Sequence, residues 1–213
     1  MNVIYEDNHL LVVEKPVNVP MQEDVSRDKD LLTLGKEYIK EKYGKPGEVY
    51  LGLVHRLDRP VGGVCVFART SKAASRLSSQ ISAHTFQKTY LAVVADNGLK
   101  DKGHFVDKLL KDPKTNMVRV DDRGKEAILD YEVLKRKDGL ALVKVYLKTG
   151  RSHQIRVQFS SRNHPLWGDQ RYNPKAVKGQ QIALHSYSIT FEHPTTKEKL
   201  VFTSPIDTYP FNI

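Results

Sequence analysis

The stretch from Val49 to Ala68 reads VYLGLVHRLDRPVGGVCVFA, and it decides the fold of the chain around it. Its two apolar runs, 49–54 and 64–68, are typical of β-strands. A charged segment separates them and ends in Gly62-Gly63, a pair that allows the backbone to approach a ligand or another segment closely. The stretch therefore predicts two strands joined by a loop that carries an acid, Asp58, at the mouth of a strand.

Outward from this stretch, turn signals and apolar spacing predict further strands and a few helices. A helix capped by Asp28 or Asp30 is expected over 31–43, and Thr70 or Ser71 is expected to cap a second helix. Asp138-Gly139 is a strong hairpin signal. Other expected elements are strands at 3–5, 10–13, 89–95, 127–134 and 140–147, a short helix over 151–160, a last hairpin formed by 182–191 and 200–203, and a basic, turn-laden segment over 103–124.

This pattern of many strands, several hairpins and few helices predicts an α+β fold. The central sheet is expected to be mixed but mostly antiparallel, with helices and loops on its flanks. The chain has no internal repeat, low-complexity tract or dividing linker, so residues 1–213 are expected to form a single domain.

The composition favours a polyanionic partner. Lys and Arg number 34 against 25 acidic residues, which gives a net charge of +9. Nucleic acid is the commonest partner for such a surplus, and no long basic amphipathic helix points to a membrane surface instead. The lone Cys65, in an apolar run, agrees with a reducing cytoplasm, and the sequence shows neither a signal peptide nor an apolar stretch near the roughly 20 residues of a membrane span.

Motifs for nucleotide cofactors and metals are absent from the sequence. It contains no Walker-type glycine loop, no GxGxxG and no HExxH, and one cysteine excludes a multi-cysteine zinc site. The eight histidines are scattered without ligand spacing. We therefore expect chemistry that uses side chains alone, with neither a cofactor nor a metal.

Two stretches carry candidate chemistry. In the first, Arg56 and Arg59 flank Asp58 and are expected to keep its carboxylate ionised, as a nucleophile or base near neutral pH requires. The second is KTGRSHQIRV over 148–157, where the charge of Arg156 beside an apolar face is expected to need a partner. Taken alone, each stretch also fits a simpler structure: a surface Asp–Arg ion pair and an amphipathic helix with a solvated basic face.

Together the motifs resemble the RluA family of pseudouridine synthases. The family pattern is HRLD-x-x-T-S-G, then K-x-Y-x-A, then TGR-[ST]-HQ-[IL]-R. The corresponding segments here are HRLD at 55–58 with Gly63, KTYLA at 88–92, TGRSHQIR at 149–156, and further likenesses at 5–16, 124–127 (GKEA), 164–169 (HPLWGD), 183–185 and 193–194. The likeness covers nearly the whole chain, roughly residues 4 to 205.

This resemblance implies an RNA pseudouridine synthase with its active-site cleft across the sheet. Such an enzyme breaks the C1′–N1 bond of uridine, turns the uracil and rejoins it through C5, an isomerisation that needs no cofactor. Asp58 would be the catalytic carboxylate, Arg156 its partner, and Tyr90 a ring that stacks on the uracil. The resemblance leaves open whether Asp58 attacks the sugar, adds to the base or removes a sugar proton.

The resemblance also implies how the RNA is held. A target uridine has to leave its stack, and Arg56 could fill the gap that it leaves. Ile155 is expected to line the uracil pocket, and His55 and Arg151 are further candidates for substrate contact, although packing and hydrogen bonding are favoured over catalysis for His55. Phosphate contacts are expected from the basic residues Lys108, Lys111, Lys114, Arg119 and Arg123.

Two departures from the family pattern bear on these expectations. The usual Thr-Ser after HRLD-x-x is Val61-Gly62 here, so two hydroxyl groups are missing. Many relatives carry an S4 RNA-binding domain, for which there is no room before Tyr5, so we expect the catalytic domain to hold the RNA, ribosomal or transfer, by itself. A monomer is the default expectation.

Two rival functions stay open at this point. One is a catalytically silent RNA-binding or assembly protein on the same fold, for which loss of Asp58, Tyr90 or Arg156 would be the sign; all three are present. The other is an RNA-binding glycosidase, which would release free uracil.

Overall fold

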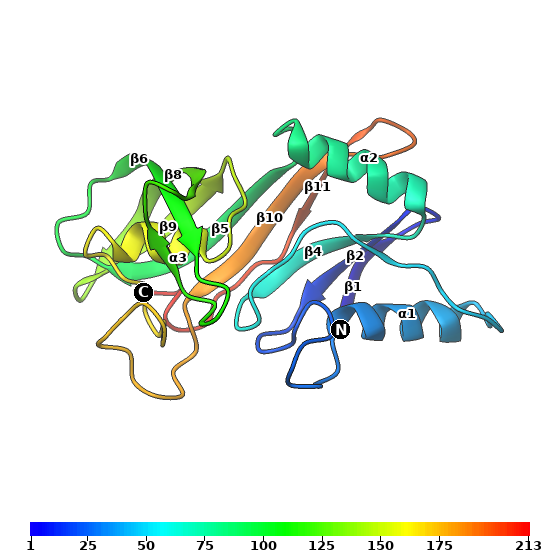
Figure 1. Cartoon of the computed structure of the whole chain (residues 1–213), viewed down its shortest axis with the longest axis horizontal. Helices are drawn as coiled ribbons and strands as arrows, with labels where there is room; N and C mark the ends of the chain where they lie inside the picture. The colour runs from blue at the N-terminus through cyan, green and yellow to red at the C-terminus, as the bar shows by residue number, and fades with distance from the viewer. The chain divides into compact units, whose positions relative to one another are not determined.

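The computed structural model describes residues 1–213, which form two compact units (Figure 1). Unit 1 comprises residues 1–87 and 186–205, and unit 2 comprises residues 88–185 and 206–213. The chain therefore leaves unit 1, builds most of unit 2, returns to complete unit 1 and ends in unit 2. That the whole chain behaves as one cooperative domain stays a prediction.

Unit 1 is built around a β-sheet with the strand order β1-β2-β4-β10-β11, and β3 pairs with β4 as well. The β1–β2, β2–β4, β3–β4 and β10–β11 pairs are antiparallel. The strands are β1 (Asn2–Glu6), β2 (Leu10–Lys15), β3 (Gly52–Leu53), β4 (Gly62–Ala68), β10 (Leu184–Glu192, of which Ser186 onward belongs to unit 1) and β11 (Lys199–Thr203).

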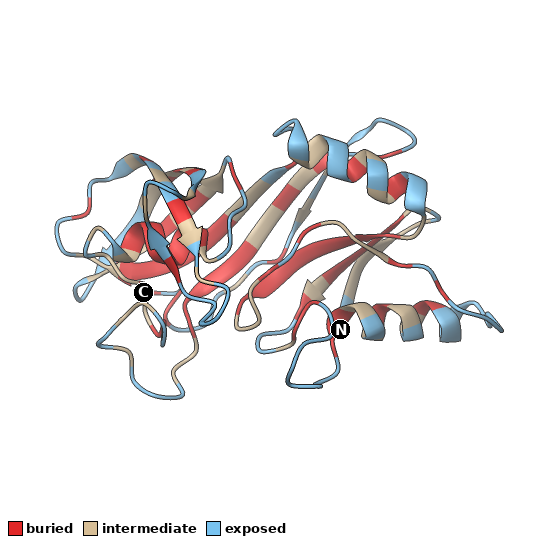
Figure 2. Ribbon diagram, in the orientation of Figure 1, coloured by how far each residue is buried: buried red, intermediate tan, exposed pale blue.

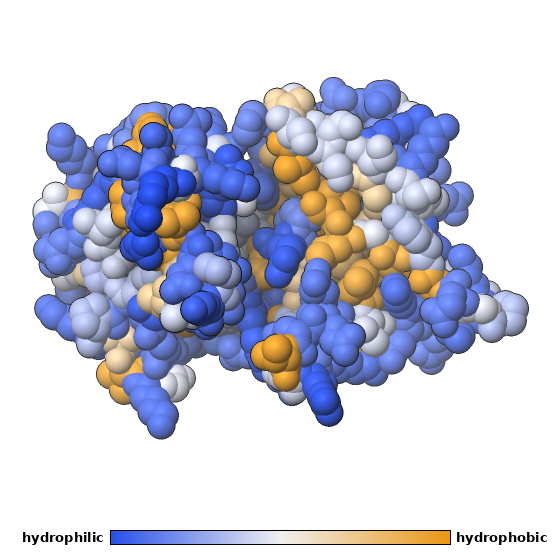
Figure 3. All heavy atoms as spheres, in the orientation of Figure 1, coloured by the Kyte–Doolittle hydropathy of each residue, from blue (hydrophilic) through white to orange (hydrophobic).

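Two helices pack on this sheet. Asp30 caps α1 (Leu31–Lys42) by accepting a hydrogen bond from the Thr33 N–H, and Thr70 caps α2 (Ser71–Ser82) in the same way. The buried faces are red in Figure 2, and Ala73 and Leu77 of α2 join the core cluster of unit 1. In Figure 3 apolar side chains are visible between the two helices, whose outer surfaces are more hydrophilic.

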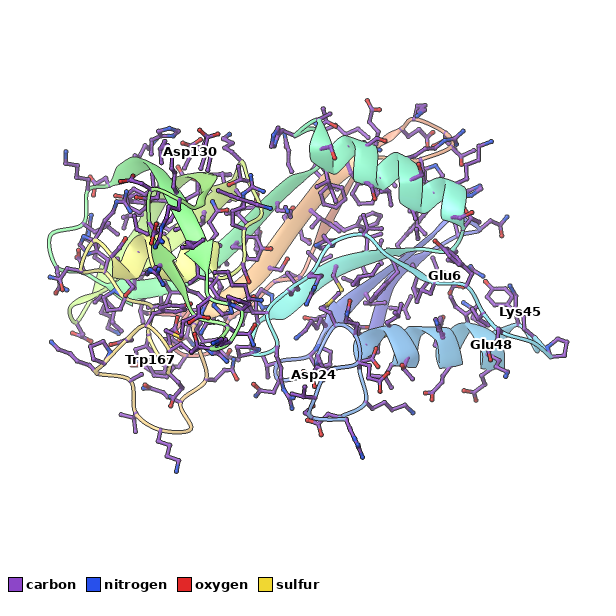
Figure 4. All side chains as sticks on the ribbon, viewed as in Figure 1. Glu6, Asp24, Lys45, Glu48, Asp130 and Trp167 are labelled. Atoms are coloured by element: carbon purple, nitrogen blue, oxygen red, sulfur yellow. The ribbon has the colours of Figure 1, made fainter.

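A buried carboxylate fastens α1 to the first strand. Glu6, labelled in Figure 4, accepts hydrogen bonds from the Tyr38 hydroxyl at 2.9 Å and the Tyr43 hydroxyl at 2.7 Å. It also forms ion pairs with Lys42 at 2.7 Å and Arg69 at 2.8 Å. This network replaces the water that a buried carboxylate loses, and it fixes the C-terminal half of α1.

Unit 2 contains a second run of antiparallel strands in the order β5-β9-β8-β6-β7. Asp138 and Gly139 form the tight β8–β9 turn with φ angles of 51° and 75°, as their sequence predicts. Phe105, Tyr131 and Phe159 pack ring against ring where α3 meets the sheet. The elements are β5 (Gln87–Ala95), β6 (Lys102–Lys111), β7 (Val118–Val120), β8 (Lys125–Lys137), β9 (Leu140–Leu147) and α3 (Gln154–Ser160).

The sequence prediction of a mostly antiparallel α+β fold is confirmed, with local differences. The basic segment 103–124 contains two strands, and in the first of them exposed residues such as Lys108 alternate with the buried Phe105 and Leu109. The strand expected over 49–54 shrinks to Gly52–Leu53. None of the three helices has the length and apolar content to span a membrane.

Candidate active site

Asp58 lies in unit 1, in the loop between β3 and β4, where its side chain is partly exposed. Its carbonyl accepts a hydrogen bond from the Val61 N–H at 2.9 Å, which closes a tight turn over Arg59 and Pro60. Proline narrows the backbone freedom of this turn by restricting its own φ angle and the residue before it. The carboxylate is thus carried by a short, closed loop.

A buried lysine, Lys15, holds this loop. Its side chain is 1% exposed. The ammonium donates to the carbonyl oxygens of Arg59 at 2.9 Å and Val61 at 2.7 Å, and to that of Pro16 at 3.0 Å. Burial lowers the pKa of Lys15 to about 8, against the opposing effects of Cys65 and Asp58. The Lys15 ammonium and the carbonyl groups of Arg59 and Val61 therefore form a clamp that holds the backbone immediately after Asp58.

Gly63 and Val61 show how the loop, which lacks the two hydroxyl groups of the family pattern, packs in this chain. Gly63 has a φ angle of +113°, and a Cβ there would lie 2.3 Å from the Ser186 carbonyl oxygen. The Ser186 hydroxyl in turn donates to the Val64 carbonyl at 2.8 Å. Val61 is buried and contributes its backbone N–H and carbonyl. Backbone contacts therefore support this loop.

The other residues around Asp58 have separate contacts in unit 1. Arg59 pairs with Asp28 and, at 3.8 Å, with Asp24, and it thereby ties the preceding loop to the Asp58 turn. His55 is buried and accepts a hydrogen bond from the Val66 N–H at 3.2 Å, the contact of a packing residue. The neighbouring Arg56 is exposed.

In unit 2, Arg156 of α3 forms a buried bidentate ion pair with Asp169. The two side chains are 4% and 0% exposed. Arg156 Nε donates to Asp169 Oδ2 at 2.8 Å, and Nη2 donates to Oδ1 at 2.7 Å. The prediction that this arginine needs a partner is confirmed, and a solvated basic face on α3 is excluded by its burial. Arg156 and Asp58 lie in different units, so the pair expected between them stays a prediction.

Asp169, the partner of Arg156, was not among the site residues predicted from the sequence. It ends the HPLWGD segment, in which Gly168 has a φ angle of +70° and a Cβ would lie 2.3 Å from the Gln181 carbonyl oxygen. Its Oδ1 also accepts the backbone N–H groups of Arg171 at 3.0 Å and Tyr172 at 3.3 Å. The motif was visible in the sequence, but the role of its acid depends on the folded path of the loop.

The segment TGRSHQ before α3 is locked by Gln154. The amide oxygen of Gln154 accepts from the Thr149 hydroxyl at 2.8 Å and from the Arg151 N–H at 3.0 Å, and its amide nitrogen donates to the Ile128 carbonyl at 3.0 Å. His153 precedes α3 with the unusual φ angle of 50°. These bonds hold the first residue of α3 in place, two positions before Arg156.

The remaining candidates of unit 2 lie on β5 and at the start of α3. Tyr90 is buried on β5, opposite Val145 of β9. Two residues earlier, burial lowers the pKa of Lys88. Ile155 is buried, whereas Arg151 is exposed and donates from Nε to the Glu126 carbonyl at 2.8 Å.

The basic candidates divide into two groups. The side chains of Arg119 and Arg123 both pair with Asp121, at 3.1 and 2.8 Å, and stay more than half exposed. The other three, Lys108, Lys111 and Lys114, are exposed on or next to β6. No group of three or more His, Cys, Asp or Glu side chains has the arrangement to hold a metal ion.

Comparison with known proteins agrees with this fold and these motifs. Residues 9–161 match the family model described as RNA pseudouridylate synthase. An uncharacterized RNA pseudouridine synthase of Aquifex aeolicus is 36% identical over 95% of this chain and 68% of its own length. The ribosomal large subunit pseudouridine synthase C of Buchnera aphidicola (subspecies Schizaphis graminum) is 32% identical over 98% of this chain and 68% of its own length.

A solved structure supports the fold independently. The human RNA pseudouridylate synthase domain containing 4 superposes with a TM-score of 0.82 at 20% identity, and the match covers 99% of this chain and 90% of that one. The class that emerges is that of isomerases acting on RNA. The chain belongs to the RNA pseudouridine synthases of the RluA type.

Proposed function

We propose that Asp58 is the catalytic carboxylate with which this chain isomerises uridine in structured RNA. The observation that carries the proposal is the clamp on its loop, in which a fully buried ammonium binds the carbonyls of Arg59 and Val61. A reacting group has to be held in a narrow range of positions, and a carboxylate on a closed, clamped turn meets this need. Partial exposure leaves it accessible to a flipped base.

Tyr90 and Arg156 complete the proposed catalytic set. Arg156 is proposed as the partner of the Asp58 carboxylate, and Tyr90 as the ring that stacks on the uracil. Arg156 suits this task because Asp169 fixes its guanidinium from one side through Nε and Nη2. Arg56, Ile155, His55 and Arg151 are proposed as substrate contacts. In the reaction the C1′–N1 bond breaks, C5 bonds to C1′, N1 gains a proton and C5 loses its hydrogen to water.

The proposed substrate is ribosomal RNA of the large subunit, and transfer RNA is the alternative to test beside it. Support comes from the names of relatives in Buchnera aphidicola and Vibrio cholerae, which are ribosomal large subunit pseudouridine synthases C and D. The net charge of +9 suits either RNA. We propose that the chain works as a monomer in the cytoplasm. We also propose that RNA phosphates are contacted by the exposed basic residues Lys108, Lys111, Lys114, Arg119 and Arg123.

The test is release of tritium from RNA labelled at C5 of uridine. Wild-type protein should release label into water, and Asp58→Asn should reduce the rate by roughly 10²- to 10⁴-fold, the range of a positioned acid–base group. Asp207→Asn, an exposed acid outside the site, is the matched control and should react normally. Equal rates for Asp58→Asn and wild type would refute the assignment. Free uracil as the product would identify a glycosidase, and RNA binding without release would identify the silent rival.

A further inference from the structure

Tyr172 contacts three different segments of unit 2 through its backbone and its ring. Its N–H reaches Asp169 Oδ1 at 3.3 Å, and its carbonyl accepts from the Ser160 hydroxyl at the end of α3, at 2.7 Å. Its ring packs against an apolar cluster that includes Leu109 of β6 and Val118 of β7. The residue thus lies where the Asp169 loop, α3 and the β6–β7 hairpin meet.

The Tyr172 hydroxyl joins the hairpin to the start of α3. It accepts a hydrogen bond from the Val118 N–H at 2.9 Å and lies 2.7 Å from His153 Nδ1. The same hydroxyl is therefore hydrogen-bonded to the backbone of β7 on one side and to the ring of His153 on the other. These two hydrogen bonds connect the β7 backbone, through the phenol, to the residue that precedes α3.

The ring of the same tyrosine lies beside the proposed catalytic arginine. The guanidinium carbon of Arg156 is 5.2 Å from the ring centroid, within the range of a cation–π contact. The ion pair with Asp169 fixes one edge of the guanidinium, and the Tyr172 ring limits its movement in another direction. Any shift of the phenol therefore changes the surroundings of Arg156.

We propose that Tyr172 is a positioning residue that couples the basic β6–β7 hairpin, residues 102–120, to Arg156. The proposal rests on the proposed function, and it adds that RNA held by this hairpin improves catalysis as well as binding. Phosphate contacts at Lys108, Lys111 and Lys114 limit the movement of the hairpin. Because the Val118 N–H of β7 is hydrogen-bonded to the phenol, the movement of the Tyr172 ring is limited as well. The ring then holds the guanidinium in its reactive direction. Packed, hydrogen-bonded side chains can carry such coupling. Tyr172 is one, since its hydroxyl contacts the Val118 N–H and its ring lies beside Arg156.

A double-mutant cycle tests the coupling. Tyr172→Phe keeps the ring and removes the hydroxyl, and Lys111→Ala with Lys114→Ala weakens the hairpin's phosphate contacts. In wild-type protein the hairpin change should raise the RNA Kd and also lower kcat about fivefold, a coupling of typical size. In the Tyr172→Phe background kcat should already be lower, and the hairpin change should then raise only Kd. If the hairpin change lowers kcat by the same factor in the wild-type and Tyr172→Phe backgrounds, the two effects are independent and the proposal is refuted.

Two further measurements separate positioning from loss of structure. Tyr146→Phe is the matched control, since it removes a hydroxyl bound to Glu132 at 2.5 Å elsewhere in unit 2, and it should leave kcat and the cycle unchanged. Amide exchange at Val118 should become faster in Tyr172→Phe, whereas unchanged exchange would contradict the hydroxyl link. If Tyr172→Phe fails to fold, His153→Asn, which suits the left-handed backbone and removes the imidazole partner of the hydroxyl, should abolish the coupling instead.

Failure of the proposed function would look different. Wild-type protein that releases no tritium from any RNA would refute the function, and the Val118 exchange and the Kd values would still test the tyrosine link. Normal wild-type turnover with a kcat in Tyr172→Phe equal to that of wild type would refute the positioning role alone.

Discussion

Asp169→Asn is expected to destabilise unit 2 far more than removal of an exposed acid. Both partners of the Arg156–Asp169 pair are almost fully buried, so the variant removes a buried negative charge from beside the guanidinium. Breaking such a pair by removing one partner costs about 3–5 kcal/mol. The asparagine NH₂ would also face an arginine N–H, so two donors would meet where one carboxylate oxygen now accepts.

The assay is urea unfolding followed by tryptophan fluorescence. Trp167, labelled in Figure 4, is the one tryptophan of the chain and precedes Asp169 by two residues in the sequence, so its emission reports this region directly. Asp130→Asn is the matched control, because Asp130 is 38% exposed and pairs with His104 and Lys148 on the surface. Its loss should cost only about 0–1 kcal/mol.

A loss for Asp169→Asn as small as that of the Asp130→Asn control would refute the reasoning. Such a result would mean that water or another side chain replaces the carboxylate beside Arg156. A large loss of stability with unchanged kcat at low temperature would support the stabilising effect of the buried pair, but it would contradict a role of Asp169 in positioning Arg156.

Three further outcomes follow from contacts in the two units. Gly63→Ala should destabilise the protein by several kcal/mol, because its Cβ would lie 2.3 Å from a carbonyl oxygen. The control Gly98→Ala, with open space around it, should show only the milder strain of a positive φ angle. Equal urea midpoints for the two variants would contradict this prediction. The folded pKa of Lys15, about 8, lies below its ordinary 10.5. The unfolded chain therefore binds more protons between these values, and wild-type stability should rise over this pH range by at most about 3 kcal/mol relative to Lys15→Met; parallel stability profiles would count against it. Burial raises the pKa of the Cys65 thiol to about 12, so native protein should resist thiol reagents. If the chain is one domain, labelling of Cys65 and loss of Trp167 emission should follow the same urea curve. Two separate unfolding curves would show that the two units unfold independently.

The local signals in the sequence determined the elements and the candidate motifs. Asp30 and Thr70 cap the helices, and Asp138-Gly139 forms the predicted turn, because each acts on backbone groups within a few residues. The prediction was weaker where a strand has one solvated face: β6 and β7 looked like a basic loop, because charged side chains alternate with few apolar ones.

Tertiary structure alone decided which partners hold the candidate residues. Lys15 reads in the sequence as an ordinary polar residue at the end of a strand, yet it binds the Arg59 carbonyl 44 positions away. The partner of Arg156 lies 13 positions further on, across a loop whose path depends on the left-handed Gly168. Neither pairing has a local signal, because each forms only when folding removes water from the charge and leaves one set of acceptors within reach.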